Sequence, residues 1–404
     1  MARFGFTDND GADVGEKYVT KEYATDVYPN IFTNINMAGL WLAGYNPTGQ
    51  LGDGSSTSKN SPVTTAGAGL NWRAIHFNNQ STTGLKTDGT LWTWGAATYG
   101  SLGNGSSTAS RSSPATTAVG GTDWAALPNP GCSTNGYGAA LKTNGLIYTW
   151  GRNNLGQLGS GGTGNRSSPL TIVGGITDWT QVACGYSHML AIRSSGLLYT
   201  WGSGAYGALG SNGVGNRSSP QTVAGASSGG NTWVYCAGGT DISAGIKSDG
   251  TLWTWGKGLL GALGDGVGAA SRVSPQTTAG GGTNWKRIAT TRDAFTAVKT
   301  DGTLWTWGSN STGQLGDGST NSSRNSPGTT AGGGTNWVTC GGKSAIKSDG
   351  TLWTWGFNFY GELGNGNFGS NRSSPGTTNY PSTSWKSCTS DVGFIAGLVE
   401  EDDW

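Results

Sequence analysis

"LKTDGTLWTWG" occupies residues 85–95 and returns with little change at 246–256, 298–308 and 346–356. One active site needs its motif once, whereas a string repeated at even spacing is typical of a structural unit. Aligned on the glycine that ends the string, the chain divides into units 48 to 56 residues apart. The aligned residues are Gly44, Gly95, Gly151, Gly202, Gly256, Gly308 and Gly356.

Three further landmarks follow each aligned glycine in the same order. The first is a Leu-Gly turn, such as "LGDG" at 51–54, and the second is a Ser-Pro dipeptide. The third is a lone tryptophan. The prolines are Pro62, Pro114, Pro169, Pro220, Pro275, Pro327 and Pro375, and the tryptophans are Trp72, Trp124, Trp179, Trp233, Trp285, Trp337 and Trp385. Seven units with four landmarks each cannot arise by chance.

One unit predicts a group of four short strands. "GLKTDGTLWTW" at 84–94 reads as two alternating runs joined by Asp-Gly, a strong hairpin signal because glycine accepts the positive φ of such turns. Glycine-rich turns and the absence of helical periodicity are typical of propeller blades. We therefore predict an all-β fold, a seven-bladed β-propeller over residues 37–404, with the tryptophans as packing residues.

The two ends of the chain predict how the ring closes. The first unit has "GLWLAG" at 39–44 without a preceding "LKTDG", and the last unit stops after "GFIAGLVEEDDW" at 393–404. Each end supplies what the other lacks. Counting 14 residues from Trp385, the distance from Trp72 to Lys86, reaches Val399. We expect residues 393–404 to form the innermost or adjacent strand of a blade that starts at Gly39, leaving no open sheet edge.

Composition excludes several classes of partner. Charged residues make up 12% of the chain and the net charge is +1, so nothing favours nucleic acid on electrostatic grounds. No stretch approaches the roughly 20 apolar residues of a membrane span, and the opening residues lack the apolar core of a signal peptide. We expect a protein made in a cytoplasm, with no nucleic-acid partner and no membrane insertion.

The repeat resembles the regulator-of-chromosome-condensation repeat. The resemblance rests on "GYNPTGQLGDG" at 44–54, "GSNSTGQLGDG" at 308–318 and "CGYSHMLAI" at 184–192. It implies seven blades of this length. That family includes nucleotide-exchange factors, protein inhibitors and interaction scaffolds, so the resemblance does not fix a function. The loops that exchange requires cannot be matched residue by residue, and exchange activity is not carried over.

One basic residue stands three positions before each landmark proline, which predicts a ring of cations. The ring could hold an anionic partner. The favoured interpretation is structural, with each cation tied to its own loop by carbonyls or by an acid such as Asp265 or Asp317. The set is Lys59, Arg111, Arg166, Arg217, Arg272, Arg324 and Arg372. A second set, interpreted as solvated strand-end charges, is Lys86, Lys142, Arg193, Lys247, Lys299 and Lys347.

Signatures of catalysis, metal binding and cofactor binding are missing. The five cysteines include no Cys-x-x-Cys pair, and Cys236, Cys340 and Cys388 occupy apolar positions as small buried thiols. The two histidines, His76 and His188, lie in expected inner strands. We predict no enzyme, no catalytic residue, no metal site and no cofactor.

Residues 1–36 differ from the repeats and form a separate N-terminal extension. The segment 8–30 carries six acids against two lysines. Its aromatic and acidic residues Tyr18, Tyr23, Asp26 and Tyr28 are candidates for partner binding. The extension could lie across the propeller as a strap, or it could be a docking peptide for a larger assembly. We favour docking.

The extension followed by "GLWLAG" also resembles repeat proteins encoded by tailed bacteriophages of marine bacteria. This resemblance implies a non-enzymatic virion component, such as a capsid decoration, appendage or tail-associated protein. It would dock through its N-terminal segment onto other virion proteins and present loops to a partner or host surface. The alternative is a cellular interaction propeller, either an exchange-factor-like regulator or a protein inhibitor. The sequence leaves the oligomeric state open.

Overall fold

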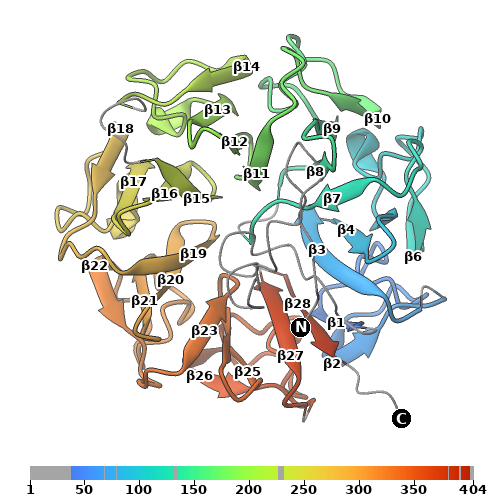
Figure 1. Ribbon diagram of the computed structural model, residues 1–404. Coiled ribbons are helices and arrows are strands. Elements are labelled where there is room, and N and C mark those ends of the chain that lie inside the picture. The colour runs from blue at the N-terminus through green and yellow to red at the C-terminus, as the bar shows by residue number, and fades with distance from the viewer. Residues whose placement is uncertain are drawn as a thin grey trace, which may run out of the picture.

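The computed structural model describes residues 38–400, apart from 68, 79, 131–133, 226–231, 381, 391 and 392. Twenty-eight strands form seven four-stranded antiparallel sheets arranged around a central axis (Figure 1). The seven-bladed propeller predicted from the repeat is therefore confirmed. The N-terminal extension, with Tyr18, Tyr23, Asp26 and Tyr28, lies outside the described residues. Within the described ranges, no helix is long and apolar enough to cross a membrane.

Each blade consists of strands A to D, ordered from the axis outward. Blades 1 to 3 follow one another along the chain. Blade 1 is β3 (Trp72–Asn78), β4 (Ser81–Lys86), β5 (Leu91–Gly95) and β6 (Arg111–Thr116); blade 2 is β7 (Trp124–Ala126), β8 (Tyr137–Lys142), β9 (Ile147–Gly151) and β10 (Arg166–Thr171); blade 3 is β11 (Trp179–Cys184), β12 (His188–Arg193), β13 (Leu198–Gly202) and β14 (Arg217–Thr222).

Blades 4 to 6 repeat this order. Blade 4 is β15 (Trp233–Gly238), β16 (Ile242–Lys247), β17 (Leu252–Gly256) and β18 (Arg272–Thr277); blade 5 is β19 (Trp285–Thr291), β20 (Ala294–Lys299), β21 (Leu304–Gly308) and β22 (Arg324–Thr329); blade 6 is β23 (Trp337–Cys340), β24 (Ser344–Lys347), β25 (Leu352–Gly356) and β26 (Arg372–Thr377). The landmark tryptophan begins strand A, and the Ser-Pro dipeptide lies in strand D, an outer edge that tolerates the missing N–H of proline.

Blade 7 is built from both ends of the chain, as predicted. Its strands A and B are β27 (Trp385–Ser390) and β28 (Phe394–Glu400), and its strands C and D are β1 (Ala38–Gly44) and β2 (Lys59–Thr64). Val399 pairs with Trp385 as Lys86 pairs with Trp72. The C-terminal strand is thus the one adjacent to the innermost strand, and β1 pairs with it over seven successive residues.

The "LWTWG" string joins the blades to one another. Its threonine binds the Leu-Gly turn of its own blade, as Thr93 Oγ1 donates to Leu102 O at 2.7 Å. Its last tryptophan binds the preceding blade, because Trp94 Nε1 donates to Gln50 O at 2.8 Å. The same inter-blade bond is made by Trp150, Trp201, Trp255 and Trp355 to Ser101, Gln157, Ala208 and Gln314.

The glycine of the Leu-Gly turn lies against this tryptophan. Gly52 has φ +70°, and a Cβ there would come within 2.6 Å of the Trp94 ring. Only glycine satisfies both the positive φ and the close approach. The "LWTWG" string and the Leu-Gly turn therefore describe one recurring contact between blades.

The lysines before the hairpin turns are not solvated strand-end charges throughout, so that prediction was wrong. Lys86 is 8% and Lys142 is 9% exposed. The Lys86 Nζ lies 5.2 Å from the ring centroid of Trp72 and 4.5 Å from that of Trp92. Burial lowers the pKa of Lys86. Antiparallel pairing places the cation between the strand A and strand C aromatic rings, where cation–π attraction offsets part of its desolvation.

Deletion of residues 394–404 tests the closure. It removes β28 from between β27 and β1 and exposes apolar residues including Phe394, Ile395 and Leu398, each at most 3% exposed in the intact ring. Such burial is worth about 1.5–3 kcal/mol per residue. We expect the melting temperature to fall by more than about 10 °C, with aggregation through the freed edges. Deletion of residues 401–404 alone is the matched control, and an unchanged melting temperature for the longer deletion would contradict this closure.

Candidate interaction surface

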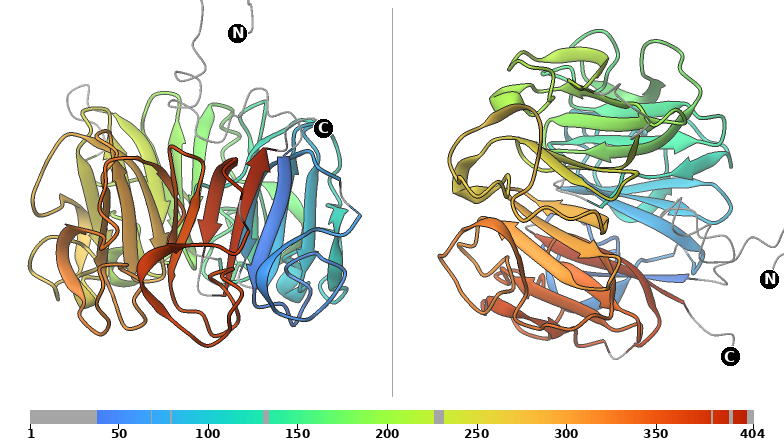
Figure 2. Two further views of the ribbon diagram at one scale, coloured as in Figure 1. Left: turned by 90° about the horizontal axis from the view of Figure 1, so that it is seen from below. Right: turned by 60° about the vertical axis from the view of Figure 1, so that its left-hand side comes forward.

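The connections between strands C and D gather on one face of the propeller. Every blade has the same antiparallel order, so all C–D loops end on one side and all Asp-Gly turns on the other. The side view shows these long connections along one edge of the disc (Figure 2). The C–D loops of blades 1 to 7 are residues 96–110, 152–165, 203–216, 257–271, 309–323, 357–371 and 45–58. We call this side the C–D face.

Internal hydrogen bonds hold these loops in shape. In blade 7, Asn46 Oδ1 accepts from Leu51 N at 2.9 Å and its Nδ2 donates to Thr57 O at 3.1 Å. Asn153, Asn310 and Asn358 make the corresponding bond to the backbone N–H of the loop leucine. This bond holds the loops of blades 2, 5, 6 and 7 in shape, whereas blades 1, 3 and 4 have Ala97, Gly204 and Gly258 in place of the asparagine.

A glutamine or glutamate decides the turn type in four of the loops. Gln50 Oε1 accepts from Thr48 N at 2.9 Å, and the same contact holds Leu155, Thr312 and Tyr360 through Gln157, Gln314 and Glu362. The other three loops have Ser101, Ala208 or Ala262 at this position. Those three form short 3-10 turns in which the residue before the glycine has a left-handed backbone.

The left-handed residues are large and exposed. They are Tyr99 (φ 61°), Tyr206 (φ 55°) and Leu260 (φ 57°), with exposed fractions of 48%, 50% and 46%. An L-residue in this conformation costs roughly 1–2 kcal/mol. Side chains that are half exposed recover little of that cost by burial. Strain at an exposed apolar residue is a hallmark of a functional surface.

Exposed apolar side chains are concentrated on the C–D face. Of the 14 large hydrophobic side chains that are exposed among the described residues, eight lie in C–D loops. Five of them belong to the adjacent blades 3 and 4, whose contact is seen where Gly207 packs against Val273. We call these five the apolar patch: Tyr206, Val214, Leu259, Leu260 and Val267.

The repeat pattern did not predict the apolar patch. A signal was present, because "GLLGALG" at 258–264 departs from the "GxNxxGQLG" pattern that identified the repeat. Deviations from a repeat consensus mark positions that the fold does not require.

The cation ring does not form a uniform ring of free charges. In three blades the cation pairs with the acid of its own Leu-Gly turn, as Arg272 does with Asp265 at 3.1 Å and Arg324 with Asp317 at 2.9 Å. Lys59 pairs with Asp53 at 3.3 Å. Arg372 donates instead to Thr377 O at 3.3 Å. The structural interpretation of the ring thus describes these four members, whereas Arg111, Arg166 and Arg217 make no hydrogen bond or ion pair within the described part of the chain.

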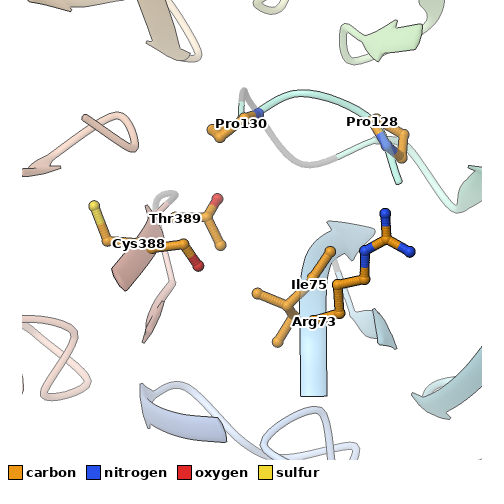
Figure 3. Close-up of a pocket in the computed structure, with 8 residues that line it drawn as sticks. Arg73, Ile75, Pro128, Pro130, Cys388 and Thr389 are labelled. Atoms are coloured by element: carbon orange, nitrogen blue, oxygen red, sulfur yellow. The ribbon is translucent and has the colours of Figure 1, made fainter. Parts of the chain in front are cut away.

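The central channel contains a loop of blade 2. Asn129 N donates to Val182 O of blade 3 at 2.8 Å, and its Nδ2 donates to Cys236 O of blade 4 at 2.9 Å. Pro128 and Pro130 flank Asn129 and line a pocket of about 30 Å³ with Arg73, Ile75 and Cys388 (Figure 3). That volume suits one water molecule. The pocket is therefore too small for a substrate.

A larger hollow lies between blades 5 and 6 on the C–D face. Its volume is about 270 Å³, and Arg292, Asp293 and Lys343 are among its lining residues. Ligand sites of roughly 300–1,000 Å³ are usually apolar with a few polar groups. This hollow is slightly smaller, and eight of its nine lining residues are polar or charged, so it does not match that description.

Both histidine side chains and four of the cysteine thiols are buried. Desolvation lowers the pKa of His76 and of His188 to about 4. Burial raises the pKa of the Cys388 thiol to about 12, and it also raises those of Cys184, Cys236 and Cys340. The prediction of small buried thiols is confirmed at Cys236, Cys340 and Cys388, which are buried and free. Among the described residues, no group of three His, Cys, Asp or Glu could hold a metal ion.

Blade 6 buries an acid where three other blades have glutamine. Glu362 is 3% exposed, and its Oε2 accepts from Tyr360 N at 2.8 Å. Desolvation raises its pKa to about 7, although the nearby Lys343 favours the ionised form. At neutral pH the carboxyl group is therefore close to half protonated.

Substitution of Leu260 tests whether its backbone is strained. Leu260→Gly relieves roughly 1–2 kcal/mol of strain and costs about 0.5–1 kcal/mol of chain entropy. We expect urea unfolding to show unchanged stability or a gain of up to about 1 kcal/mol. Leu263→Ala, at a residue that is 1% exposed, should cost about 2–5 kcal/mol. A large loss for Leu260→Gly would show that Leu260 contributes to the core.

The raised pKa of Glu362 predicts a stability that depends on pH. In the folded state the pKa is about 7, against 4.5 for the free group. The folded protein holds the extra proton in this window, so this contribution is complete below about pH 4.5 and is lost as pH rises through 7. Glu362→Gln keeps the accepting oxygen and should remove up to about 3 kcal/mol of this dependence, measured by urea unfolding at about pH 5 and 8. The reciprocal Gln157→Glu should introduce a similar dependence; equal pH slopes in all three proteins would contradict this assignment.

Comparison with known proteins agrees with this geometry. The model of the regulator of chromosome condensation (RCC1) repeat matches residues 144–192, 195–246, 301–344 and 349–389. The human E3 ubiquitin-protein ligase HERC2 is 30% identical over 255 residues, which is 62% of this chain and 5% of that protein. The ultraviolet-B receptor UVR8 of Arabidopsis thaliana is 30% identical over 227 residues, 56% of this chain and 50% of that protein. The chain thus spans half or less of these curated relatives.

Solved structures share the fold across nearly the whole chain. Prp20p from Saccharomyces cerevisiae superposes with a TM-score of 0.76 at 17% identity, covering 96% of both chains. Human WBSCR16 gives a TM-score of 0.76 at 19% identity, covering 91% of this chain and all of that one. The four matched stretches and the shared blades support the resemblance to the RCC1 family, and the chain is an RCC1-like seven-bladed propeller.

Proposed function

We propose that this protein is a non-enzymatic interaction propeller that binds a protein partner through the C–D face. The observation that carries the proposal is that the loops of blades 3 and 4 each expose a large apolar side chain on a residue with a strained backbone. Tyr206 and Leu260 keep a left-handed backbone while about half of each side chain faces solvent. A protein interface offers a reason for such residues, because interfaces bury exposed aromatic and aliphatic anchors.

The scaffold suits this role. In the loop of blade 3, Gly204 N donates to Asn216 Oδ1 at 3.0 Å, and Ala208 O accepts from Trp255 Nε1 of blade 4 at 2.9 Å. In the loop of blade 4, Gly258 N donates to Ser271 Oγ at 3.4 Å, and Gly264 lies against the Trp307 ring of blade 5. Rigid loops lose little conformational entropy on binding, which favours affinity. The similar proteins also support it, since Prp20p is described with binding properties to Gsp1p and histones.

Whether the propeller belongs to a cellular complex or to a virion is a separate question. The sequence suggested a virion role with docking through Tyr18, Tyr23, Asp26 and Tyr28. These four residues lie outside the described part of the chain. HERC2 and UVR8, from animals and a plant, favour the cellular alternative. We therefore propose a cellular interaction propeller, with the virion component as the second candidate that the N-terminal resemblance supports.

A comparison of purified complexes tests the interaction. The tagged protein, Leu259→Ser/Leu260→Ser and the control Val338→Ser are expressed in the source cells, and co-purifying proteins are quantified. Val338 is 42% exposed but lies in strand A of blade 6, outside the apolar patch. We expect a stoichiometric partner with the wild type and the control, and a loss of at least about tenfold with the double variant, as for interface anchors.

Retention of every partner by the double variant would contradict the C–D face as the interface. Mass spectrometry of purified particles from the same culture separates the two assemblies. Recovery of the protein in particles supports the virion role, and recovery only in the soluble lysate contradicts it.

A further inference from the structure

Charge is distributed unevenly over the C–D face. In blades 1 to 3, the loops and the first residue of strand D span 96–111, 152–166 and 203–217, and they contain four arginines and no acid. In each of the other four blades, the corresponding segment contains one acid. We call the segments 96–111, 152–166 and 203–217 the basic sector. Its arginines are Arg111, Arg152, Arg166 and Arg217.

The acids that the basic sector lacks are those that pair with the first cation of strand D in other blades. Blades 4, 5 and 7 carry Asp265, Asp317 and Asp53 in the Leu-Gly turn, and each binds the cation that begins strand D. Blades 1, 2 and 3 have Asn104, Ser160 and Ser211 at that position. Arg166 and Arg217 are exposed and Arg111 is half-buried, and none of the three pairs with a described residue.

The fourth arginine is held in place by an aromatic ring. The guanidinium of Arg152 lies 4.9 Å from the ring centroid of Tyr99 in blade 1, and its Nε donates to Asn154 Oδ1 at 3.0 Å. A guanidinium stacked on a ring keeps its remaining donors directed to solvent. The basic sector thus combines one fixed and three free guanidinium groups on adjacent blades.

The neighbouring strand connections add no acid to this side of the sector. The A–B connections of blades 1 to 3, residues 79–80, 127–136 and 185–187, contain no Asp, Glu, Lys or Arg. The loop of blade 3 belongs both to the basic sector and to the apolar patch, through Tyr206 and Val214. The loop segment of blade 3 therefore carries both a free arginine and exposed apolar side chains.

We propose that the basic sector and the apolar patch together bind an acidic protein segment whose carboxylates alternate with aromatic or aliphatic side chains. The carboxylates would accept bonds from the free guanidinium groups, and the apolar side chains would cover Tyr206, Leu259 and Leu260. This inference rests on the proposed function and names the chemistry of its partner.

The geometry favours protein over nucleic acid. Specific duplex binding with strong salt dependence uses roughly 6–10 phosphate contacts. The basic sector offers four arginines spread over three blades, and the adjacent patch is aliphatic as well as aromatic. A nucleic acid would leave the aliphatic residues without a partner, whereas an acidic peptide satisfies both halves of the surface.

The test measures binding of defined probes to the full chain by fluorescence anisotropy. The probes are a labelled peptide that repeats Glu-Glu-Leu-Tyr four times, the same peptide with Gln for Glu, and an oligothymidine of equal charge. We expect the Glu peptide to bind tightest and to weaken at least about tenfold between about 50 mM and 300 mM salt. Arg166→Gln/Arg217→Gln should weaken it roughly fivefold or more.

Two further variants separate charge from structure. Ser160→Asp/Ser211→Asp installs the acids that the other blades possess, so it should weaken the Glu peptide as much as removal of the arginines, with both guanidinium groups still present. Arg372→Gln, at the same repeat position outside the sector, is the matched control and should leave binding unchanged. Thermal melting confirms that each variant folds.

Three results would overturn the inference. The first is binding of the Gln peptide that is as tight as that of the Glu peptide and does not change with salt. If Leu259→Ser/Leu260→Ser abolished that binding, the proposed interaction function would stand, but its partner would not be acidic. The second is no binding of the Glu peptide at any salt concentration. The third is tighter binding of oligothymidine than of the Glu peptide, which would assign the basic sector to nucleic acid.

Discussion

The contact between a strand C tryptophan and the Leu-Gly turn of the preceding blade is the constraint on which the ring depends. Trp94 donates to Gln50 O at 2.8 Å, and its ring fills the space that a side chain at Gly52 would need. The same bond is made by Trp150, Trp201, Trp255 and Trp355, whereas at the junction of blades 6 and 7 Gly364 lies against Pro62 and Ala43. The arrangement closes only when the last blade meets the first, which explains why both chain ends contribute strands to blade 7.

This contact separates the residue positions that the fold requires from the surface positions that can differ between blades. The threonine and tryptophan of "LWTWG" and the Leu-Gly turn bind backbone groups, so their identity follows from the fold. The side chains that flank the Leu-Gly pair do not take part in those bonds. Blades 3 and 4 use that freedom to expose Tyr206 and Leu260, and blades 1 to 3 use it to omit the acid that would neutralise their arginines.

Buried charge is handled differently at the two ends of a blade. Near the Asp-Gly turns, lysines such as Lys86 lie between two aromatic rings, where the attraction to the ring faces replaces part of the lost hydration. On the C–D face, Glu362 takes the place of glutamine and keeps the same bond to the backbone. Its burial raises its pKa to about 7, so the carboxyl is partly neutral where a glutamine is always neutral.

The sequence by itself determined the architecture, because two of the landmarks that define the repeat, the strand C tryptophan and the Leu-Gly turn, make the contact between blades. Seven strings of the "LWTWG" type, four of them identical, and seven Leu-Gly turns fix seven blades. The distance from Trp385 to Val399 fixes the register of the closing strand. Local patterns were also sufficient for the buried thiols and for the acids that bind Arg272 and Arg324.

Only the tertiary structure decided the surface. The burial of Lys86 depends on its register opposite Trp72, and the filled channel depends on Asn129 reaching strands in two other blades. The left-handed turns at Tyr99, Tyr206 and Leu260 depend on the glutamine that those loops lack. The first two features arise from contacts between strands, and the third from a contact two residues apart that the repeat pattern does not record. A repeat pattern records what its copies share, whereas the proposed interface lies where they differ.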